Sequence, residues 1–138
     1  MARAGDLFEI GQVGKRAIAG NVQESTASLI DLDRLKVVAT ERTGAAPYGV
    51  AFAADGSAAL VVNQESGTVA VVSADDLKTK APPIRVGNYP EGVGITRDGR
   101  KAFVANWFSD DISVIDIASA KEIRRIKCAP GPRAITVR

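Results

Sequence analysis

A repeated unit of 42 or 43 residues is the feature that most constrains the fold of this chain. The segment Pro47–Gly56 (PYGVAFAADG) returns 43 residues later as Pro90–Gly99 (PEGVGITRDG), and Gly5–Gly14 (GDLFEIGQVG) fits the same frame more loosely. Residues 132–138 (PRAITVR) begin the unit once more. We therefore expect one domain, 1–138, with units at approximately 5–43, 44–86 and 87–129 and the first strand of a further unit at 130–138.

Each unit holds four short stretches that are rich in β-forming residues and separated by turn residues. In the second unit these stretches are residues 49–53, 58–63, 68–73 and roughly 80–86. The Asp-Gly pairs at 55–56 and 98–99 predict tight turns between the first two strands, because glycine adopts a positive φ without a Cβ clash. No segment shows a convincing helical period. The sequence predicts an all-β protein.

The composition narrows the chemistry that these residues can perform. Among 138 residues there is no histidine, which excludes histidine general bases, imidazole metal ligands and the Ser/His and Cys/His nucleophile pairs. The lone Cys128 cannot form an intrachain disulfide, and no histidine is present to activate its thiol. A net charge of +2 is too small to indicate a polyanionic partner. We predict no cofactor and no metal site.

The repeat resembles the YVTN type of β-propeller repeat. Its motif, Gly-x-x-Pro-x-Gly-Val followed by Asp-Gly, Val-x-Asn and Ser-Val-Ile-Asp, is most complete at Gly87–Val93, Asp98-Gly99, Phe103–Asn106 and Ser113–Asp116. The first unit departs from it, because Gly5 replaces the proline and Val13 replaces the turn aspartate. The resemblance implies propeller blades of four antiparallel strands, three to the chain, and suggests a periplasmic or extracellular location.

Three blades form an incomplete ring, since closed propellers use roughly 4 to 8 blades. The two outer faces of such a group are apolar, and left open they would be sites of aggregation. We therefore expect a homo-oligomer that completes a ring, or a longer propeller of which this chain is a part, or a partner that covers these faces. No run of 18 apolar residues predicts a membrane span, and the first six residues (MARAGD) lack the apolar stretch of a signal peptide.

Antiparallel strands sort the loops of a blade onto two rims. The connections from second to third and from fourth to first strand share one rim, which we call the loop-bearing rim, and the Asp-Gly turns share the other, the Asp-Gly rim. Four of the seven aromatic residues fall on the loop-bearing rim: Tyr48, Tyr89, Trp107 and Phe108. On loops these rings are available to a ligand or partner, although packing on neighbouring loops to cap the blade edges explains them as well.

One repeat position on this rim changes its chemistry from unit to unit. The residue after the loop proline is Tyr48, then Glu91, then Arg133, while the glycine and valine of the motif recur around it. A polar position that varies between otherwise similar blades, near the mouth of the channel, is where we expect residues specific to a binding site. Propellers of the resembled type commonly place their functional site there. The alternative is simple exposure to solvent without a role.

The other recurring polar residues are expected to be structural. Asn21, Asn63 and Asn106 end the second strand and should hydrogen-bond the backbone of the loop that follows, and Asp31 and Asp116 should stabilise the turn after the third strand. Asp110-Asp111 lacks a calcium loop around it and is expected on the solvated surface. The basic residues of the C-terminal stretch are expected to discourage edge pairing: Lys121, Arg124, Arg125, Lys127, Arg133 and Arg138.

The sequence thus predicts a non-catalytic propeller module that binds or assembles through its loop-bearing rim. The binding residues predicted are Tyr48, Glu91, Arg133, Tyr89 and Trp107. Its partners would be further copies or blades, and a small molecule or protein at the rim, with no nucleic acid and no membrane span. The alternative is a fragment of a larger propeller enzyme, an oxidoreductase or lactonase-like protein, whose active site needs the missing blades.

Overall fold

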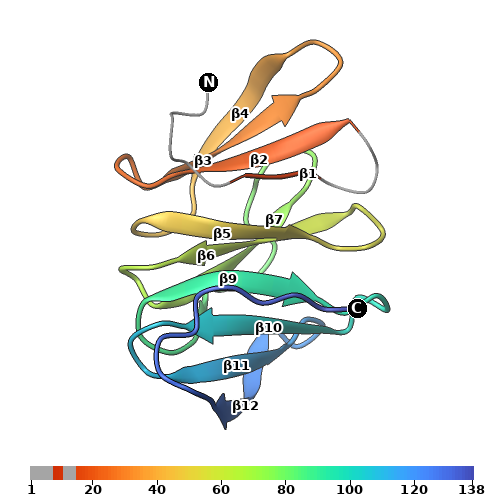
Figure 1. The fold of residues 1–138 in the computed structure, drawn as a ribbon. Helices are drawn as coiled ribbons and strands as arrows, with labels where there is room; N and C mark the ends of the chain where they lie inside the picture. The colour runs from red at the N-terminus through yellow and green to blue at the C-terminus, as the bar shows by residue number, and fades with distance from the viewer. Residues whose placement is uncertain (1–7, 11–14) are drawn as a thin grey trace.

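The computed structural model describes residues 8–10 and 15–138, and the first unit's Gly5 and Val13 lie outside them. The chain is all-β, with three antiparallel sheets of four strands, which we call the first, second and third blades (Figure 1). The first contains β1 (Phe8–Ile10), β2 (Arg16–Asn21), β3 (Thr26–Asp31) and β4 (Lys36–Arg42). The second contains β5 (Pro47–Phe52), β6 (Ala58–Asn63), β7 (Thr68–Ser73) and β8 (Ile84–Arg85). The third contains β9 (Pro90–Ile95), β10 (Lys101–Asn106), β11 (Asp111–Asp116) and β12 (Lys121–Lys127).

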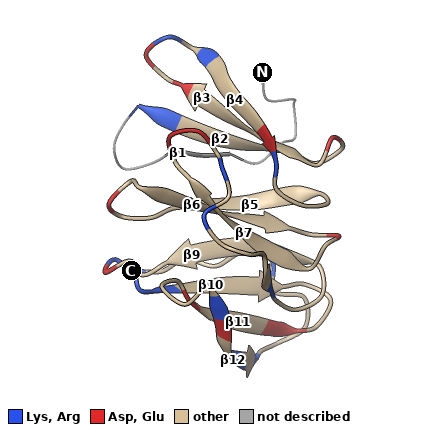
Figure 2. Cartoon of the chain, turned by 180° about the vertical axis from the view of Figure 1, so that it is seen from behind, with Lys and Arg blue, Asp and Glu red and all other residues tan. Residues whose placement is uncertain are grey.

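Two apolar cores lie between neighbouring blades and hold them face to face. Ile18 and Leu29 of the first blade pack with Val61 and Leu77 of the second, and all four side chains are buried. The period-2 alternation of β6 sends Leu60 and Val62 to its other face, where they pack with Val104 and Ile115 of the third blade. A blade in the middle of the stack therefore needs apolar residues on both faces of its strands. Figure 2 shows that β5, β6 and β7 accordingly carry no charged residue.

The turns repeat in the backbone as well as in the sequence. Positive φ angles recur in three columns: Ser25, Gly67 and Asp110; Leu35, Leu77 and Ala120; and Ala46, Tyr89 and Gly131. The Asp-Gly turns are formed as expected, because Gly56 and Gly99 have φ angles of 72° and 70°. In each turn the preceding aspartate accepts a hydrogen bond from the backbone N–H two residues on.

The fourth strand of the second blade is shorter than the sequence predicted. Instead of residues 80–86, only Ile84–Arg85 form β8, and an isolated bridge joins Val72 to Thr79. Pro82 and Pro83 explain the difference, because a proline has no N–H to donate to a neighbouring strand. The outer edge of the second blade is therefore a largely irregular segment.

The last residues lie along the inner strand of the third blade without being paired into a strand (Figure 1). A Cβ placed on Gly92 would come within 2.6 Å of the Arg133 carbonyl oxygen, and one on Gly94 within 2.8 Å of the Val137 side chain. Residues 131–138, which we call the C-terminal segment, thus cover part of β9. Their assignment to a fourth blade stays a prediction.

The three blades form an open arrangement and not a closed ring. The first blade contacts the second and the second contacts the third, and among the described residues no further blade lies beside the outer faces of the first and third blades. In the part of the chain that the structure describes, no helix is long and apolar enough to cross a membrane.

Candidate binding site on the loop-bearing rim

The loops that were expected to share a rim are joined there by backbone hydrogen bonds. In the second blade the Gln64 N–H donates to the Ala46 carbonyl at 2.9 Å, and in the third blade the Trp107 N–H donates to the Tyr89 carbonyl at 3.1 Å. Each hydrogen bond ties the turn between the second and third strands to the loop that enters the first. The loop-bearing rim is therefore a set of braced loops on which side chains have fixed positions.

Glu91 and Arg133 form an ion pair on this rim. The Arg133 Nε donates to Glu91 Oε2 at 2.7 Å, and its Nη2 donates to Oε1 at 3.0 Å, which is the bidentate geometry that guanidinium and carboxylate favour. The Glu91 side chain is 3% exposed and that of Arg133 is 54% exposed. Gln64 Nε2 donates a third hydrogen bond to Glu91 Oε1 at 2.9 Å. The carboxylate is thus fully engaged by its own protein.

Arg133 also contacts the aromatic part of the rim. Its guanidinium carbon lies 4.2 Å from the centre of the Trp107 ring, within the range of a cation–π interaction. The hydrogen bonds that Arg133 donates to Glu91, together with the charge of that carboxylate, raise the pKa of Arg133, and Tyr48 adds a smaller contribution in the same direction. Arg133 is therefore a cation in contact with Glu91 and Trp107 together.

Three aromatic rings extend this contact toward solvent. The Tyr89 ring packs edge-on against Trp107, with ring centres 5.8 Å apart, and stacks on Phe108 at 4.7 Å. Phe108 is 61% exposed, which is uncommon for a side chain of this size and polarity. Tyr89 adopts a positive φ of 53°, a conformation costly for a residue with a bulky side chain. The surface formed by Tyr89, Trp107, Phe108 and Arg133, which we call the aromatic platform, thus consists of three rings in mutual contact and a bordering cation.

The five residues predicted from the sequence are brought together. Arg133 contacts both Glu91 and Trp107, and Tyr89 joins them through Trp107. Tyr48 lies near enough to act on the charge of Arg133. Glu91 is buried and paired, so it positions Arg133 and is not itself open to a ligand. Whether these residues bind a partner stays a prediction.

Two members of this cluster were not among the predicted binding residues. Gln64 was not predicted because it lies on a different blade from Glu91, and only the packing of the two blades brings their side chains together. A usable signal exists in the repeat, since Gln64 and Trp107 occupy the same position and each contacts the variable residue of the next unit. Phe108 was noted on the rim, but nothing in the sequence separated it from a capping residue.

The recurring asparagines are structural, with partners that differ from the expected ones. They bind hydroxyl groups on the next strand and the loop that enters the blade, instead of the loop that follows them. Asn63 Nδ2 donates to the Thr43 carbonyl at 3.1 Å, and Asn106 Oδ1 accepts from the Gly87 N–H at 3.2 Å. Asn106 Nδ2 also donates to Ser113 Oγ at 2.9 Å. Asn63 and Asn106 thus hold the second and third blades to their own entering loops, and Asn21 donates to Thr26 and Ser28 of the neighbouring strand.

The expectations for the aspartates have mixed outcomes. Asp31 and Asp116 accept hydrogen bonds from backbone N–H groups of the following turns, as expected. Asp111 is 2% exposed, so its placement on the solvated surface was wrong. It accepts a hydrogen bond from Asn106 at 2.8 Å and lies 3.8 Å from the Lys127 ammonium, and these contacts offset the cost of burying its charge. Among the described residues no group of three or more acidic or cysteine side chains could hold a metal ion.

Comparisons with known proteins support the fold. No family model matches the sequence, and no curated protein matches it. Among solved structures the chain is similar to the hydrazine synthase of Kuenenia stuttgartiensis, with 27% identity, a TM-score of 0.87 and coverage of 92% of this chain and 37% of that one. It is also similar to a protein of unknown function from Desulfotomaculum acetoxidans DSM 771, with 18% identity, a TM-score of 0.80 and coverage of 92% and 43%. A third, U3-55K, shares 7% identity with a TM-score of 0.84 and coverage of 94% and 41%.

These neighbours are β-propeller-like, and the chain spans well under half of each of them. The three sheets of this chain thus correspond to part of a propeller. The finer assignment to YVTN repeats stays a prediction.

Proposed function

We propose that this chain is a non-catalytic assembly and binding module, a three-blade segment whose third blade docks a further blade and whose loop-bearing rim binds a partner. The proposal combines an open apolar face with a neighbouring surface of exposed aromatic groups. Each part is argued from contacts of its own and has a test of its own.

One comparison within the molecule carries the assembly part. On the second blade, Leu60 and Val69 face the third blade and are 2% and 0% exposed. The same positions on the third blade are Phe103 and Ile112, which face outward and are only partly buried. The third blade therefore presents the same kind of apolar face that the second blade buries under its neighbour, and we infer that a further blade covers it.

The C-terminal segment supports this inference through a second repeated contact. A Cβ on Gly49 of β5 would lie 2.0 Å from the Glu91 carbonyl oxygen of the next inner strand. A Cβ on Gly92 of β9 would lie 2.6 Å from the Arg133 carbonyl oxygen. The C-terminal segment thus approaches β9 in the way that β9 approaches β5, as the innermost strand of a fourth blade would. It lacks strand pairing because the second strand of such a blade is not part of this chain.

Light scattering after size-exclusion chromatography tests the assembly part. Phe103→Asp places a charge on the open face and should convert associated chains to monomers. Phe108→Asp is the matched control, because it makes the same change on the aromatic platform and should leave the mass unchanged. Loss of association with Phe108→Asp but not with Phe103→Asp would assign the contact to the rim and overturn the proposal for the blade face.

The exposed Phe108 carries the binding part. Aromatic rings and arginine side chains are enriched where proteins bind partners, and here they meet on braced loops. A displayed peptide library tests whether the aromatic platform binds peptides. Peptides are selected for binding to the wild-type chain, and those that also bind Phe108→Asp are removed. Trp107 is the only tryptophan, so its fluorescence reports binding at this place. The proposal expects peptides that shift this fluorescence and need Phe108, and it fails if selected peptides bind both proteins equally.

The alternative function is that of a segment of a larger propeller enzyme. The likeness to a hydrazine synthase, at 27% identity, favours it. The reading frame of the gene around this chain distinguishes the two functions. Further blades that carry histidines or other catalytic groups toward the same channel would favour the enzyme, and blades without such groups would favour the binding module.

A further inference from the structure

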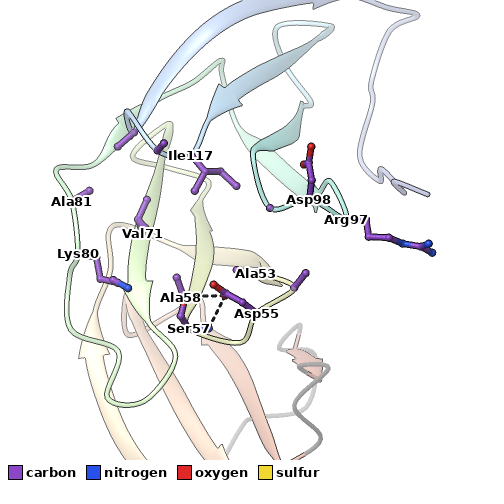
Figure 3. Close-up of a pocket in the computed structure, with 14 residues that line it drawn as sticks. Ala53, Asp55, Ser57, Ala58, Val71, Lys80, Ala81, Arg97, Asp98 and Ile117 are labelled. Carbon is purple, nitrogen blue, oxygen red and sulfur yellow. Dashed lines mark hydrogen bonds between the residues drawn. The ribbon is translucent and has the colours of Figure 1, made fainter.

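A cavity of about 470 Å³ opens on the Asp-Gly rim, away from the aromatic platform. It lies between the second and third blades and is lined from both of them (Figure 3). Its apolar wall includes Val71, Ile117 and Ala120, and its volume is within the usual range of small-molecule pockets. Sequence reasoning missed this cavity, because it depends on the sizes of side chains that face each other across two blades.

The cavity exists because this blade interface carries smaller residues than the other one. Leu29 and Leu77 fill the interface between the first and second blades and are 0% and 1% exposed. The same repeat positions at the interface between the second and third blades are Val71 and Ala120. Leu77 and Ala120 share a left-handed backbone, with φ angles of 63° and 53°, so the difference lies in the side chain and not in the path of the chain. One interface is closed and the other is left open.

The acidic groups at the mouth of the cavity are already engaged by their own turns. Asp55 Oδ1 accepts hydrogen bonds from the Ser57 N–H at 2.9 Å and the Ser57 hydroxyl at 2.8 Å. Asp98 Oδ1 accepts from Thr96 Oγ1 at 2.6 Å and from the Arg100 N–H at 3.0 Å. Both carboxylates therefore have a structural role in the Asp-Gly turns.

The cation at the mouth has no such role. Figure 3 shows Lys80 extended toward the side of the cavity formed by Ser57 and Ala58, whereas Arg97 points away from the other lining residues. Among the described residues no carboxylate forms an ion pair with Lys80. The same repeat position holds Val38 and Ile123 in the other units, so a charge here is particular to this interface. An apolar cavity thus carries at its mouth one ammonium group that has no carboxylate in ion-pair contact among the described residues.

We propose that this cavity binds a small apolar carboxylate, with the hydrocarbon part between the two blades and the carboxylate against Lys80. Apolar surface of Val71, Ile117 and Ala120 is removed from water when the hydrocarbon enters. The charge of Lys80 selects an anionic head over a neutral one. Hydrogen bonds from Ser57 lower the pKa of Asp55 and the charge of Lys80 adds a smaller effect, so Asp55 interacts with Lys80 at longer range, without an ion-pair contact. This inference is independent of the functions proposed for the blade face and the aromatic platform.

Isothermal titration of the 138-residue chain with 3-phenylpropanoate tests the proposal, with 3-phenylpropanamide as the neutral probe. The wild type should bind the carboxylate more tightly than the amide. Lys80→Gln should weaken the affinity for the carboxylate by about threefold, which is the size of effect expected for an exposed ion pair. It should leave the affinity for the amide unchanged. Lys78→Gln removes an exposed lysine of the same segment that does not line the cavity, and it should change neither affinity.

Ala120→Leu tests the cavity itself, because it introduces the side chain that fills the same position at the other interface. It should abolish the binding of both probes while thermal unfolding stays cooperative. Absence of carboxylate binding at millimolar concentration would overturn the proposal, as would undiminished binding in Ala120→Leu. If that variant does not fold, equal affinity of Lys80→Gln and wild type for the carboxylate overturns the assignment instead.

Discussion

Glu91 illustrates at the scale of a single residue how one repeat position acquires a structural role. It follows the loop proline as Tyr48 and Arg133 do, yet it is buried because Gln64 of the second blade and Arg133 of the C-terminal segment both donate to it. A buried carboxylate is tolerated only while its charge is matched. Arg133 is therefore important both to the aromatic platform and to the stability of the third blade.

Removal of Arg133 should destabilise the chain. In Arg133→Ala the Glu91 carboxylate keeps only the hydrogen bond from Gln64, and we expect the free energy of unfolding to fall by about 1–3 kcal/mol. Glu91→Gln in the same background should restore part of this loss, because it removes the unmatched charge. Urea unfolding measures both effects, with the exposed Arg124→Ala as control. A double variant no more stable than Arg133→Ala would contradict this role of the ion pair.

The turn aspartates should make stability depend on pH. The hydrogen bond from the Thr96 hydroxyl, followed by that from the Arg100 N–H, lowers the pKa of Asp98 below 3.8 in the folded chain. The unfolded chain therefore takes up a proton first as the pH falls, so the contribution of Asp98 is complete above pH 3.8 and is lost as the pH falls through the lower, folded pKa. Asp98→Asn should show a smaller loss of unfolding free energy between pH 5 and pH 2. Equal slopes in wild type and variant would contradict it.

The candidate site was predictable at the scale of residues only where the repeat itself carried a signal. Tyr48, Glu91 and Arg133 were found because their position varies within a constant motif, and the structure pairs Glu91 with Arg133. Gln64 and the burial of Asp111 were not predictable in this way, because they depend on which side chains face each other once the strands are packed. Periodicity gives the face on which a residue lies, but not its partner.

At the scale of the elements, strand pairing follows the sequence wherever backbone donors are available. The turn residues and the period-2 pattern located β6 and β7 at the predicted residues, 58–63 and 68–73. The fourth strand was overpredicted because Pro82 and Pro83 interrupt its donors. The C-terminal segment is the opposite case, since the repeat predicts a strand there but residues 131–138 are not paired into one.

The contact between β9 and the C-terminal segment should be sensitive to a single methyl group. In Gly92→Ala the new Cβ would meet the Arg133 carbonyl, so the segment must move outward. We expect trypsin to cleave after Arg133 several times faster in this variant than in wild type. Cleavage after the exposed Arg97 on the Asp-Gly rim is the internal control and should not change. Unchanged cleavage after Arg133 would mean that the segment does not depend on this close approach.

At the scale of the whole molecule, the two blade interfaces differ in how well they are filled. Leu77 should contribute strongly to the stability of the fold because its side chain is buried, with 1% exposed. We therefore expect Leu77→Ala to lower the free energy of unfolding by about 2–4 kcal/mol. Ala120→Leu should leave stability unchanged or raise it, since it fills space that is already open. Thermal and urea unfolding of the pair measures the difference. A larger loss for Ala120→Leu than for Leu77→Ala would contradict the comparison of the two interfaces.

The open outer face of the third blade gives the central claim its most direct test, the mass of the wild-type chain by sedimentation equilibrium. Phe103 and Ile112 lie where the second blade buries Leu60 and Val69, so a folded chain should find another blade to cover them. We predict a mass above 14.4 kDa at micromolar concentration that decreases on dilution and returns to 14.4 kDa in Phe103→Asp. A wild-type chain that stays at 14.4 kDa at micromolar concentration and unfolds cooperatively would contradict the claim.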